Sequence, residues 1–267
     1  MNSKPRFFCF SHIPKTAGTT FNAILDRNFH GRLHRTSHGF YEEKLKPEQI
    51  GWALGRGETY LRCLGGHAVS ANLPYDHSDY DVIGLTILRD PVDRLISEYF
   101  YLRKLGVKSL VQKEWNGFLD EIAQSRPDSF FWNTQLRFLG VSMDEFKKRI
   151  NEGKLFVFPQ HRFDEGLLLL KKRFFEFRDV SYVSRNINPS RREGLECPDW
   201  FKEKCMAQDV ELFDVACRAF DSQLDIAFGE RLTAAVAAHK AQCIRRKIFR
   251  EPLRKFISRV YSLVSRW

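Results

Sequence analysis

The chain has 267 residues, of which 43% are hydrophobic and 28% charged, a composition typical of globular proteins and not of disordered ones. None of its apolar runs approaches the length of a membrane-spanning helix, which excludes a protein held in a bilayer by such runs. The net charge of +10 is uneven, because residues 240–267 hold nine Lys and Arg against Glu251 alone and carry +8 of it. The remainder is nearly neutral, so we expect no nucleic-acid partner.

The six cysteines are scattered without a C-x-x-C pair. We therefore expect reduced thiols, no zinc site and no other metal. The first strand is predicted within about six residues of Met1, which leaves no room there for a targeting segment. The expected location is the cytoplasm.

The first strand, loop and helix are predicted from "FFCFSHIPKTAGTTFNAIL", which begins at Phe7. The helix is expected to start near Thr19 or Thr20, with threonine capping its first turn. In such a joint, backbone N–H groups and a lysine converge on a phosphate-like anion. The predicted donors are Lys15, Thr16, Ala17, Gly18, Thr19 and Thr20. The alternative is a lysine beside an ordinary helix cap.

The loop departs from the common nucleotide-binding pattern G-x-x-x-x-G-K-[ST]. When that pattern is aligned on Lys15 and Thr16, its two glycines fall on Cys9 and Pro14. A phosphate ligand other than Mg-ATP is therefore favoured.

A second strand-to-helix joint is predicted in "YDVIGLTILRDPVDRLISEYFYLRKLG" from Tyr80. Asp90 and Pro91 suit the cap and the first position of the helix. Arg89 ends the strand, and Ser97 lies two helical turns beyond Asp90 on the same face. An arginine and a hydroxyl at a strand end fit a second phosphate, although a structural arginine paired with an acidic neighbour is the alternative.

The order of strand, turn and helix recurs in "KLFVFPQHRFDEGLLLLKKRF", where Phe163, Leu167, Leu170 and Phe174 share one helical face. "FLDEIAQS" and "SMDEFKKRI" predict surface helices. The alternation predicts an α/β fold with a central, mostly parallel sheet flanked by helices in three layers. Ligands of such folds bind at the carboxyl ends of the strands, where Lys15 and Arg89 are expected.

We expect one domain over residues 1–239 and a basic amphipathic segment over residues 240–267. Apolar residues recur there at helical spacing between basic ones, and Pro252 is expected to break or kink the helix. Such a segment suits peripheral contact with an anionic membrane surface. Docking on its own domain or on a second subunit is an equal alternative.

"HIPKTAGTTF" followed by "LRDPVDRLISEYFYLR" resembles the carbohydrate sulfotransferases, in particular the family that includes heparan sulfate 2-O-sulfotransferase. The resemblance covers roughly residues 7–190. It implies a P-loop-like fold and 3′-phosphoadenylyl sulfate (PAPS) as the donor. The first loop would hold the 5′-phosphosulfate, and Arg89 and Ser97 the 3′-phosphate. A loop in "SYVSRNINPSRR" would close over the adenine and 3′-phosphate through Arg185, Asn186 and Arg192.

The resemblance also implies a catalytic pair. His67, in "GGHAVS", would remove the proton of the acceptor hydroxyl, and Lys15 would stabilise the leaving phosphate without a metal. Gly65 stands where relatives can carry a first histidine, so a second imidazole is expected to be absent. A structural role for His67 is the alternative, and His34, His38 and Glu98 are the reserve bases.

The acceptor is expected to be a hydroxyl on a glycan, polysaccharide or glycolipid. Asn133, Gln135 and Arg137 are the candidate contacts, although a helix packed beside the site would show the same residues. Two other classes of protein stay open. One is a P-loop kinase or NTPase that uses Mg-ATP, and the other is a non-catalytic basic protein that binds polyanions or membranes.

Overall fold

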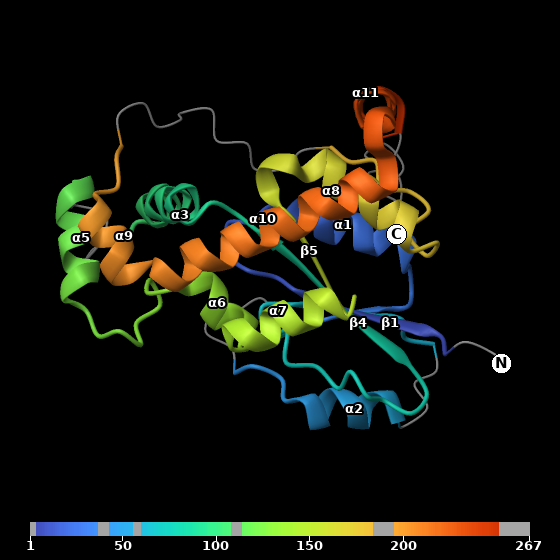
Figure 1. The fold of residues 1–267 in the computed structure, drawn as a ribbon, viewed down its shortest axis with the longest axis horizontal. Coiled ribbons are helices and arrows are strands. Elements are labelled where there is room, and N and C mark those ends of the chain that lie inside the picture. Colours follow the sequence, from blue (N-terminus) through green and yellow to red (C-terminus); the bar gives the residue numbers. More distant parts are fainter. Residues whose placement is uncertain (1–3, 37–42, 56–59, 108–113, 184–194, 251–267) are drawn as a thin grey trace, which may run out of the picture.

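A parallel five-stranded sheet forms the centre of the computed structural model, which describes residues 4–36, 43–55, 60–107, 114–183 and 195–250 (Figure 1). The strand order is β2-β3-β1-β4-β5. In chain order the strands are β1 (Arg6–Ser11), β2 (Leu33–Arg35), β3 (Cys63–Gly66), β4 (Asp81–Leu88) and β5 (Leu155–Pro159). The predicted α/β class with a central parallel sheet is confirmed.

The central strands are apolar on both faces, as strands covered on both sides must be. In β1, Phe8 and Phe10 point to one face and Phe7 and Cys9 to the other, and all four are at most 3% exposed. Phe8 pairs with Cys63 of β3 and with Ile83 of β4. This register aligns the three strands whose ends form the candidate site.

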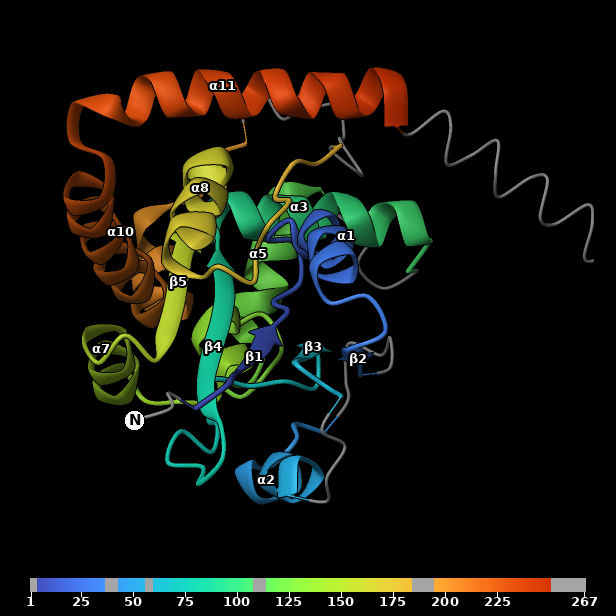
Figure 2. The ribbon, with the colours of Figure 1, turned by 90° about the vertical axis from the view of Figure 1, so that its right-hand side faces the viewer.

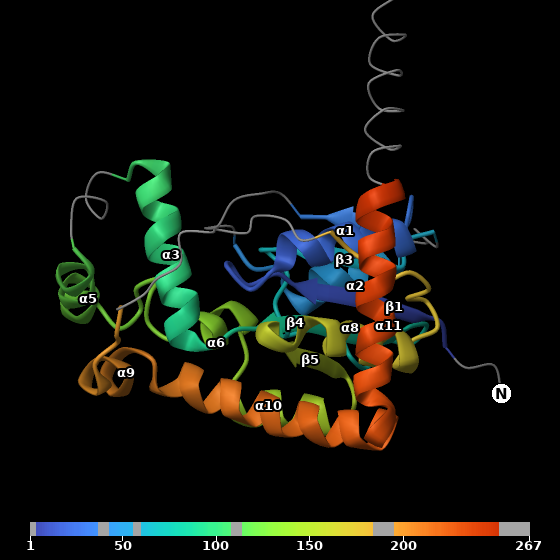
Figure 3. The ribbon, with the colours of Figure 1, turned by 90° about the horizontal axis from the view of Figure 1, so that it is seen from above.

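Helices α1 (Gly18–Asn28) and α8 (Phe163–Arg173) cover one face of the sheet. The predicted apolar stripe of α8 is buried there, since Leu167 and Leu170 are fully enclosed. The long helix α10 (Ala207–Phe228) runs along the β5 edge (Figure 3) and contributes Phe220 and Leu224 to the same core.

The opposite face packs against α2 (Pro47–Gly55), α6 (Thr134–Leu139) and α7 (Met143–Asn151). A further cluster at one end of the molecule joins α3 (Pro91–Leu105), α5 (Trp115–Gln124) and α9 (Asp199–Cys205) (Figure 1). The two predicted surface helices correspond to α5 and α7, each of which buries one face. The molecule therefore has the expected three layers plus an outlying helical cluster.

The C-terminal part of the described chain turns at η2 (Gly229–Arg231) into α11 (Leu232–Arg245), which continues as the π-helical turn η3 (Arg246–Arg250). Figure 2 shows α11 lying across α8, outside the sheet layers. The predicted boundary at residue 240 falls inside α11, and Pro252 lies outside the described residues. None of the described helices is both long and apolar enough to cross a membrane.

Candidate active site

The candidate site begins where three parallel strands end side by side. Ser11, the last residue of β1, pairs with Gly66 of β3 and Thr86 of β4. The loops that follow these strands therefore start at one edge of the sheet, as expected for the carboxyl ends of parallel strands. They bring together the Lys15 loop, His67 and Arg89.

The Lys15 loop has an unusual backbone. Lys15 and Ala17 are left-handed, with φ of 68° and 70°, whereas Thr16 between them is not. Left-handed non-glycine residues are strained and cluster at functional sites. Alternating backbone conformations also turn successive N–H groups inward, which creates a concave anion site. The loop thus has the geometry that phosphate recognition needs.

The hydroxyl of Thr16 holds the loop itself together. Thr16 is fully buried, and its Oγ1 donates to the carbonyl oxygen of Ile13 at 2.9 Å. Because a hydroxyl has one hydrogen, this bond uses the proton that a bound anion would need. Thr16 can therefore serve an anion through its backbone N–H, whereas Thr19 is exposed and presents its side chain to solvent.

Helix α1 starts earlier than the sequence predicted. It begins at Gly18, with Ala17 as a left-handed N-cap and no side-chain cap, so the expected threonine cap is wrong. The reason is that the carbonyl of Ala17 already accepts the N–H groups of Thr20 and Phe21 at 3.0 and 3.2 Å. A helix start without a side-chain cap suits an anion-binding loop, because a ligand can bind the first N–H groups.

His67 has its tautomer fixed by the backbone. Its Nδ1 lies 2.7 Å from the carbonyl oxygen of His12. A carbonyl only accepts hydrogen bonds, so Nδ1 carries the proton and the lone pair of the neutral ring is on Nε2. The residue is 9% exposed. This is the tautomer that a general base at Nε2 requires.

A second imidazole is present, which corrects the expectation from Gly65. The ring of His12 stacks on that of His67 with centroids 4.1 Å apart, and it also stacks on the ring of Phe10. Burial, with a smaller effect of His67, lowers the pKa of His12 to about 3. His12 is therefore a neutral platform for His67 near neutral pH.

Two glycines make room for this pair. A Cβ on Gly18 would lie 1.9 Å from the His12 ring, so only glycine lets helix α1 start against that ring. Gly66, just before His67, has a φ of 150°, and a Cβ there would lie 1.9 Å from the Thr36 hydroxyl. The position of His67 thus depends on two glycines, Gly18 against the His12 ring and Gly66 against Thr36.

Lys44 adds positive charge next to the histidines. Its Nζ donates to the carbonyl oxygen of His67 and lies 4.0 Å from the centre of the Phe138 ring. Phe138 in turn contacts the His67 ring edge-on. Sequence reasoning missed Lys44, because it comes from the segment before α2 and belongs to no motif.

Arg89 connects the two predicted anion sites. Its Nη1 donates to the carbonyl oxygen of Lys15 at 3.2 Å. Gln135 fixes the backbone of Arg89, since its Oε1 accepts the Arg89 N–H at 2.9 Å and its Nε2 donates to the Arg89 carbonyl at 2.8 Å. Gln135 is fully buried, so it cannot meet an acceptor directly and instead positions Arg89.

Two helices near Arg89 cap one another. The Oδ1 of Asn133 accepts the N–H groups of Gln208 and Asp209 at the start of α10. The carboxylate of Asp209 accepts those of Gln135 and Leu136 at the start of α6, at 3.0 and 2.9 Å. The side chain of Asn133 thus has a structural role as a helix cap. The third predicted acceptor contact, Arg137, is exposed and donates to the carbonyl of Ser129.

Helix α3 completes the site from one side. Asp90 caps it by accepting the N–H of Asp93 at 2.9 Å, as predicted, with Pro91 at the first helical position. The Nζ of Lys15 lies 3.8 Å from the centre of the Tyr101 ring. Ser97 is half-buried on the same helix.

The reserve base Glu98 is buried in an ion pair with Arg94. Its carboxylate is 3.7 Å from Nη1 of Arg94, and Nη2 of Arg94 donates to the Thr134 hydroxyl at 3.0 Å. Burial raises the pKa of Glu98, whereas Arg94 and Lys15 oppose that rise. Glu98 is therefore placed to balance these cations and not to meet a substrate.

Comparison with known proteins identifies the family. The model of the sulfotransferase family matches residues 2–163, more than half of the chain. The protein belongs to the sulfotransferase family. Among solved structures, a sulfotransferase from Alicyclobacillus acidocaldarius is similar, with 18% identity and a TM-score of 0.41 over 80% of this chain and 95% of that one. No curated protein matches the chain in sequence.

The other predicted residues of this sulfotransferase are not all brought to the site. His34 is exposed on the edge strand β2. His38, Arg185, Asn186 and Arg192 lie outside the described residues. Within the described ranges, the residues that converge are those of the Lys15 loop, His67 and Arg89, together with the unpredicted His12, Lys44 and Asp209. Gln135, which was predicted as an acceptor contact, also lies there and instead bonds the backbone of Arg89.

Proposed function

We propose that the protein transfers the sulfuryl group of PAPS to a hydroxyl of a carbohydrate. The observation that carries the proposal is the junction of the Lys15 loop with His67. The carbonyl that fixes the His67 tautomer belongs to His12, three residues before Lys15 on the same loop. A base and an anion site are thereby held in one rigid unit, as transfer from an anionic donor requires.

The reaction follows from these positions. The acceptor hydroxyl gives its proton to Nε2 of His67 as its oxygen forms a bond to sulfur. The bond between sulfur and the bridging oxygen breaks in line with the attack, and its electron pair goes to the 5′-phosphate. Lys15 and the N–H groups of residues 16–19 stabilise the charge that develops there, since the N–H of Thr20 already donates to the Ala17 carbonyl. Adenosine 3′,5′-bisphosphate leaves.

The assignment of the donor rests on the pairing of two anion sites. Arg89 bonds to the loop backbone, so a ligand at both sites would hold a phosphate at each end of one nucleoside. We assign the 3′-phosphate to Arg89 and Ser97, and keep Arg185, Asn186 and Arg192 as predicted contacts. The carbohydrate acceptor follows from the family resemblance, with Asn133 and Arg137 as its remaining candidate contacts.

Calorimetry tests the donor. Adenosine 3′,5′-bisphosphate is titrated against AMP and ATP, with and without Mg²⁺, into the parent, Arg89→Ala and the control Arg126→Ala. Arg126 is exposed and pairs only with Asp128 among the interactions described. We expect Mg²⁺-independent binding that depends on the 3′-phosphate and is lost in Arg89→Ala alone. Preference for Mg-ATP would instead favour a kinase or NTPase.

The alternative of a polyanion-binding protein without enzymatic activity is tested by removing residues 251–267. The cut is placed there because Arg246 is buried in the domain. The enzyme proposal requires that nucleotide binding be unchanged, whereas a polyanion binder should bind its ligand more weakly, because the cut removes four of the nine basic residues of this segment. The same truncation tests the proposed peripheral membrane contact, through binding to anionic vesicles.

A further inference from the structure

A second cluster of polar side chains lies between α8 and α11, apart from the proposed active site. It consists of Asp164, His239 and Cys243, whose ligand atoms all lie within 4.8 Å of one another. The Nε2 of His239 is 3.5 Å from Oδ1 of Asp164 and 3.6 Å from Sγ of Cys243. Sequence reasoning missed this cluster because 75 residues separate Asp164 from His239.

The helices position the three groups. His239 and Cys243 are four residues apart on α11, so they lie on the same face one turn apart. That face packs on α8, where Asp164 is in the first turn. His239 is buried and the other two are half-buried. Regular helix geometry therefore brings a carboxylate, an imidazole and a thiol together.

Two of the three distances between these atoms match tetrahedral zinc coordination, and the third, between the Asp164 carboxylate and Cys243 Sγ, is within 4.8 Å. Zinc bonds of about 2.3 Å to sulfur and about 2.0–2.1 Å to nitrogen or oxygen place S and N about 3.6 Å apart, and N and O about 3.4 Å apart. The corresponding distances here are 3.6 and 3.5 Å. Small side-chain shifts would suffice to close the set around an ion.

The surroundings supply outer-shell partners of the kind that hold zinc ligands. The hydroxyl of Tyr182 donates to Oδ1 of Asp164 at 3.0 Å, and the N–H of Tyr182 donates to Sγ of Cys243 at 3.3 Å.

We propose that Asp164, His239 and Cys243 bind one Zn²⁺ ion, with water in the fourth position. Thiolate and imidazole ligands favour zinc over Mg²⁺ or Ca²⁺, which prefer oxygen. Binding replaces the S–H bond of Cys243 with a Zn–S bond and releases the proton to solvent, with no redox change. The sequence-based expectation of no metal is thereby revised, independently of the proposed sulfuryl transfer.

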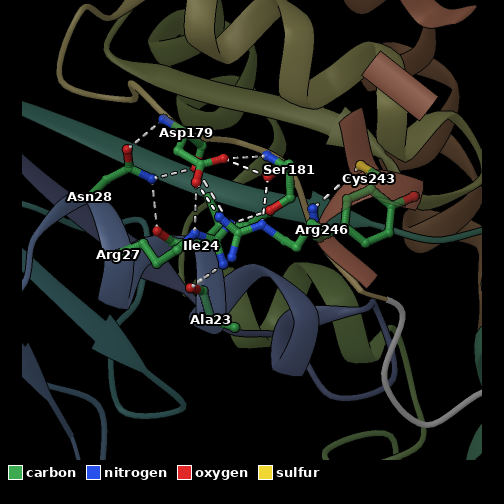
Figure 4. A network of polar contacts seen from close by, with 9 residues as sticks. Ala23, Ile24, Arg27, Asn28, Asp179, Ser181, Cys243 and Arg246 are labelled. Carbon is green, nitrogen blue, oxygen red and sulfur yellow. Dashed lines mark hydrogen bonds and ion pairs between the residues drawn. The ribbon is translucent and has the colours of Figure 1, made fainter. Parts of the chain in front are cut away.

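The ion would act as a cross-link between α11 and the domain, beside an existing polar network (Figure 4). There Arg246 donates to the Ser181 hydroxyl at 2.6 Å and forms an ion pair with Asp179. Asp179 also pairs with Arg27 of α1, at 3.4 Å. Zinc would fix α11 about one turn before Arg246. The ion would therefore have a structural role and take no part in the reaction.

Cobalt substitution tests the site. The full-length protein is stripped with a chelator and titrated with Co²⁺, and then with Zn²⁺ in competition. We expect a cobalt–thiolate charge-transfer band at a 1:1 ratio that Zn²⁺ removes. Cys243→Ser should abolish the band and weaken zinc binding at least about 100-fold. Cys217→Ser, which changes another half-buried cysteine, is the matched control and should bind as the parent does.

A second variant and a second readout guard against misfolding. Asp164→Asn keeps the size of the side chain and should weaken binding while far-UV circular dichroism stays native. Zinc should also raise the Tm of the parent and of Cys217→Ser but not of Cys243→Ser. If the parent gives no thiolate band, or if all variants bind zinc equally, the cluster is a metal-free hydrogen-bond network and the proposal is wrong.

Discussion

Two buried histidine clusters in this protein have different surroundings and therefore different chemistry. At the sheet edge, His67 bonds a backbone carbonyl and stacks on His12, so the ring keeps a lone pair on Nε2. Between α8 and α11, His239 directs Nε2 at a carboxylate and a thiol. The comparison shows that the partner of each ring nitrogen, more than burial, decides whether a histidine suits proton transfer or metal binding.

The two clusters also differ in how the backbone builds them. The sheet-edge cluster depends on left-handed residues at 15 and 17 and on close approaches at Gly18 and Gly66. The α8–α11 cluster uses only regular helices and a spacing of four residues. The sheet-edge cluster should therefore be sensitive to small backbone changes. The α8–α11 cluster should be sensitive to the loss of one of its metal-binding side chains.

Replacing the base should have the largest effect. His67→Asn is expected to lower kcat for sulfuryl transfer about 10²–10⁴-fold, because it removes the proton acceptor. His30→Asn, which changes an exposed histidine, is the control. Steady-state kinetics with PAPS provides the measurement. An unchanged kcat would place the base elsewhere, and His34→Asn would then test the exposed reserve candidate.

Crowding the His12–His67 pair should have the next largest effect. Gly18→Ala is expected to lower the free energy of unfolding by about 1–3 kcal/mol, because its Cβ would overlap the His12 ring. Gly51→Ala is the matched control, since its Cβ would be 3.9 Å from its nearest neighbour in an ordinary contact. Denaturant unfolding of both variants measures the difference. Equal stabilities would contradict the tight packing at Gly18.

The titration of His12 should appear in the pH dependence of stability. Its pKa in the folded state is about 3, against the ordinary histidine value of 6.5, so the unfolded chain binds more protons between these values. Stability should therefore fall as pH drops through this window, by up to about 1.4 kcal/mol per pH unit from this group. His12→Phe, which keeps a ring for stacking, should flatten the curve. Identical slopes would show that His12 does not titrate as described.

Removing one cap should have the smallest effect. Asn133→Ala is expected to destabilise the protein by about 1 kcal/mol, because the N–H groups of Gln208 and Asp209 lose their acceptor. Asn72→Ala, at an exposed position, is the control. Thermal unfolding measures the change, and zinc affinity should stay the same because α11 is not involved. A loss of zinc binding would mean that the capping of α10 is coupled to the α8–α11 cluster.

The sequence predicted what local patterns encode. The strand–loop–helix joints, the Asp90 cap and the buried stripe of α8 were correct, because each follows from neighbouring residues. The start of α1 was wrong by one or two residues, since left-handed backbone at Ala17 replaces a side-chain cap.

The missed features all depend on long-range register. Residues 12 and 67 are stacked only because β1 and β3 are parallel with Ser11 opposite Gly66. Asp209 meets Gln135 from 74 positions away. No single-sequence pattern shows such pairings, because they depend on how the elements pack.

The reciprocal caps of α6 and α10 have a consequence for biosynthesis. The family match ends at residue 163, yet Asp209, which holds the helix that fixes Arg89, follows it. A nascent chain that has emerged only as far as β5 already has the Lys15 loop, but not the carboxylate that anchors Gln135. Arg89 is therefore expected to reach its final position only after α10 has left the ribosome, late in the synthesis of the chain.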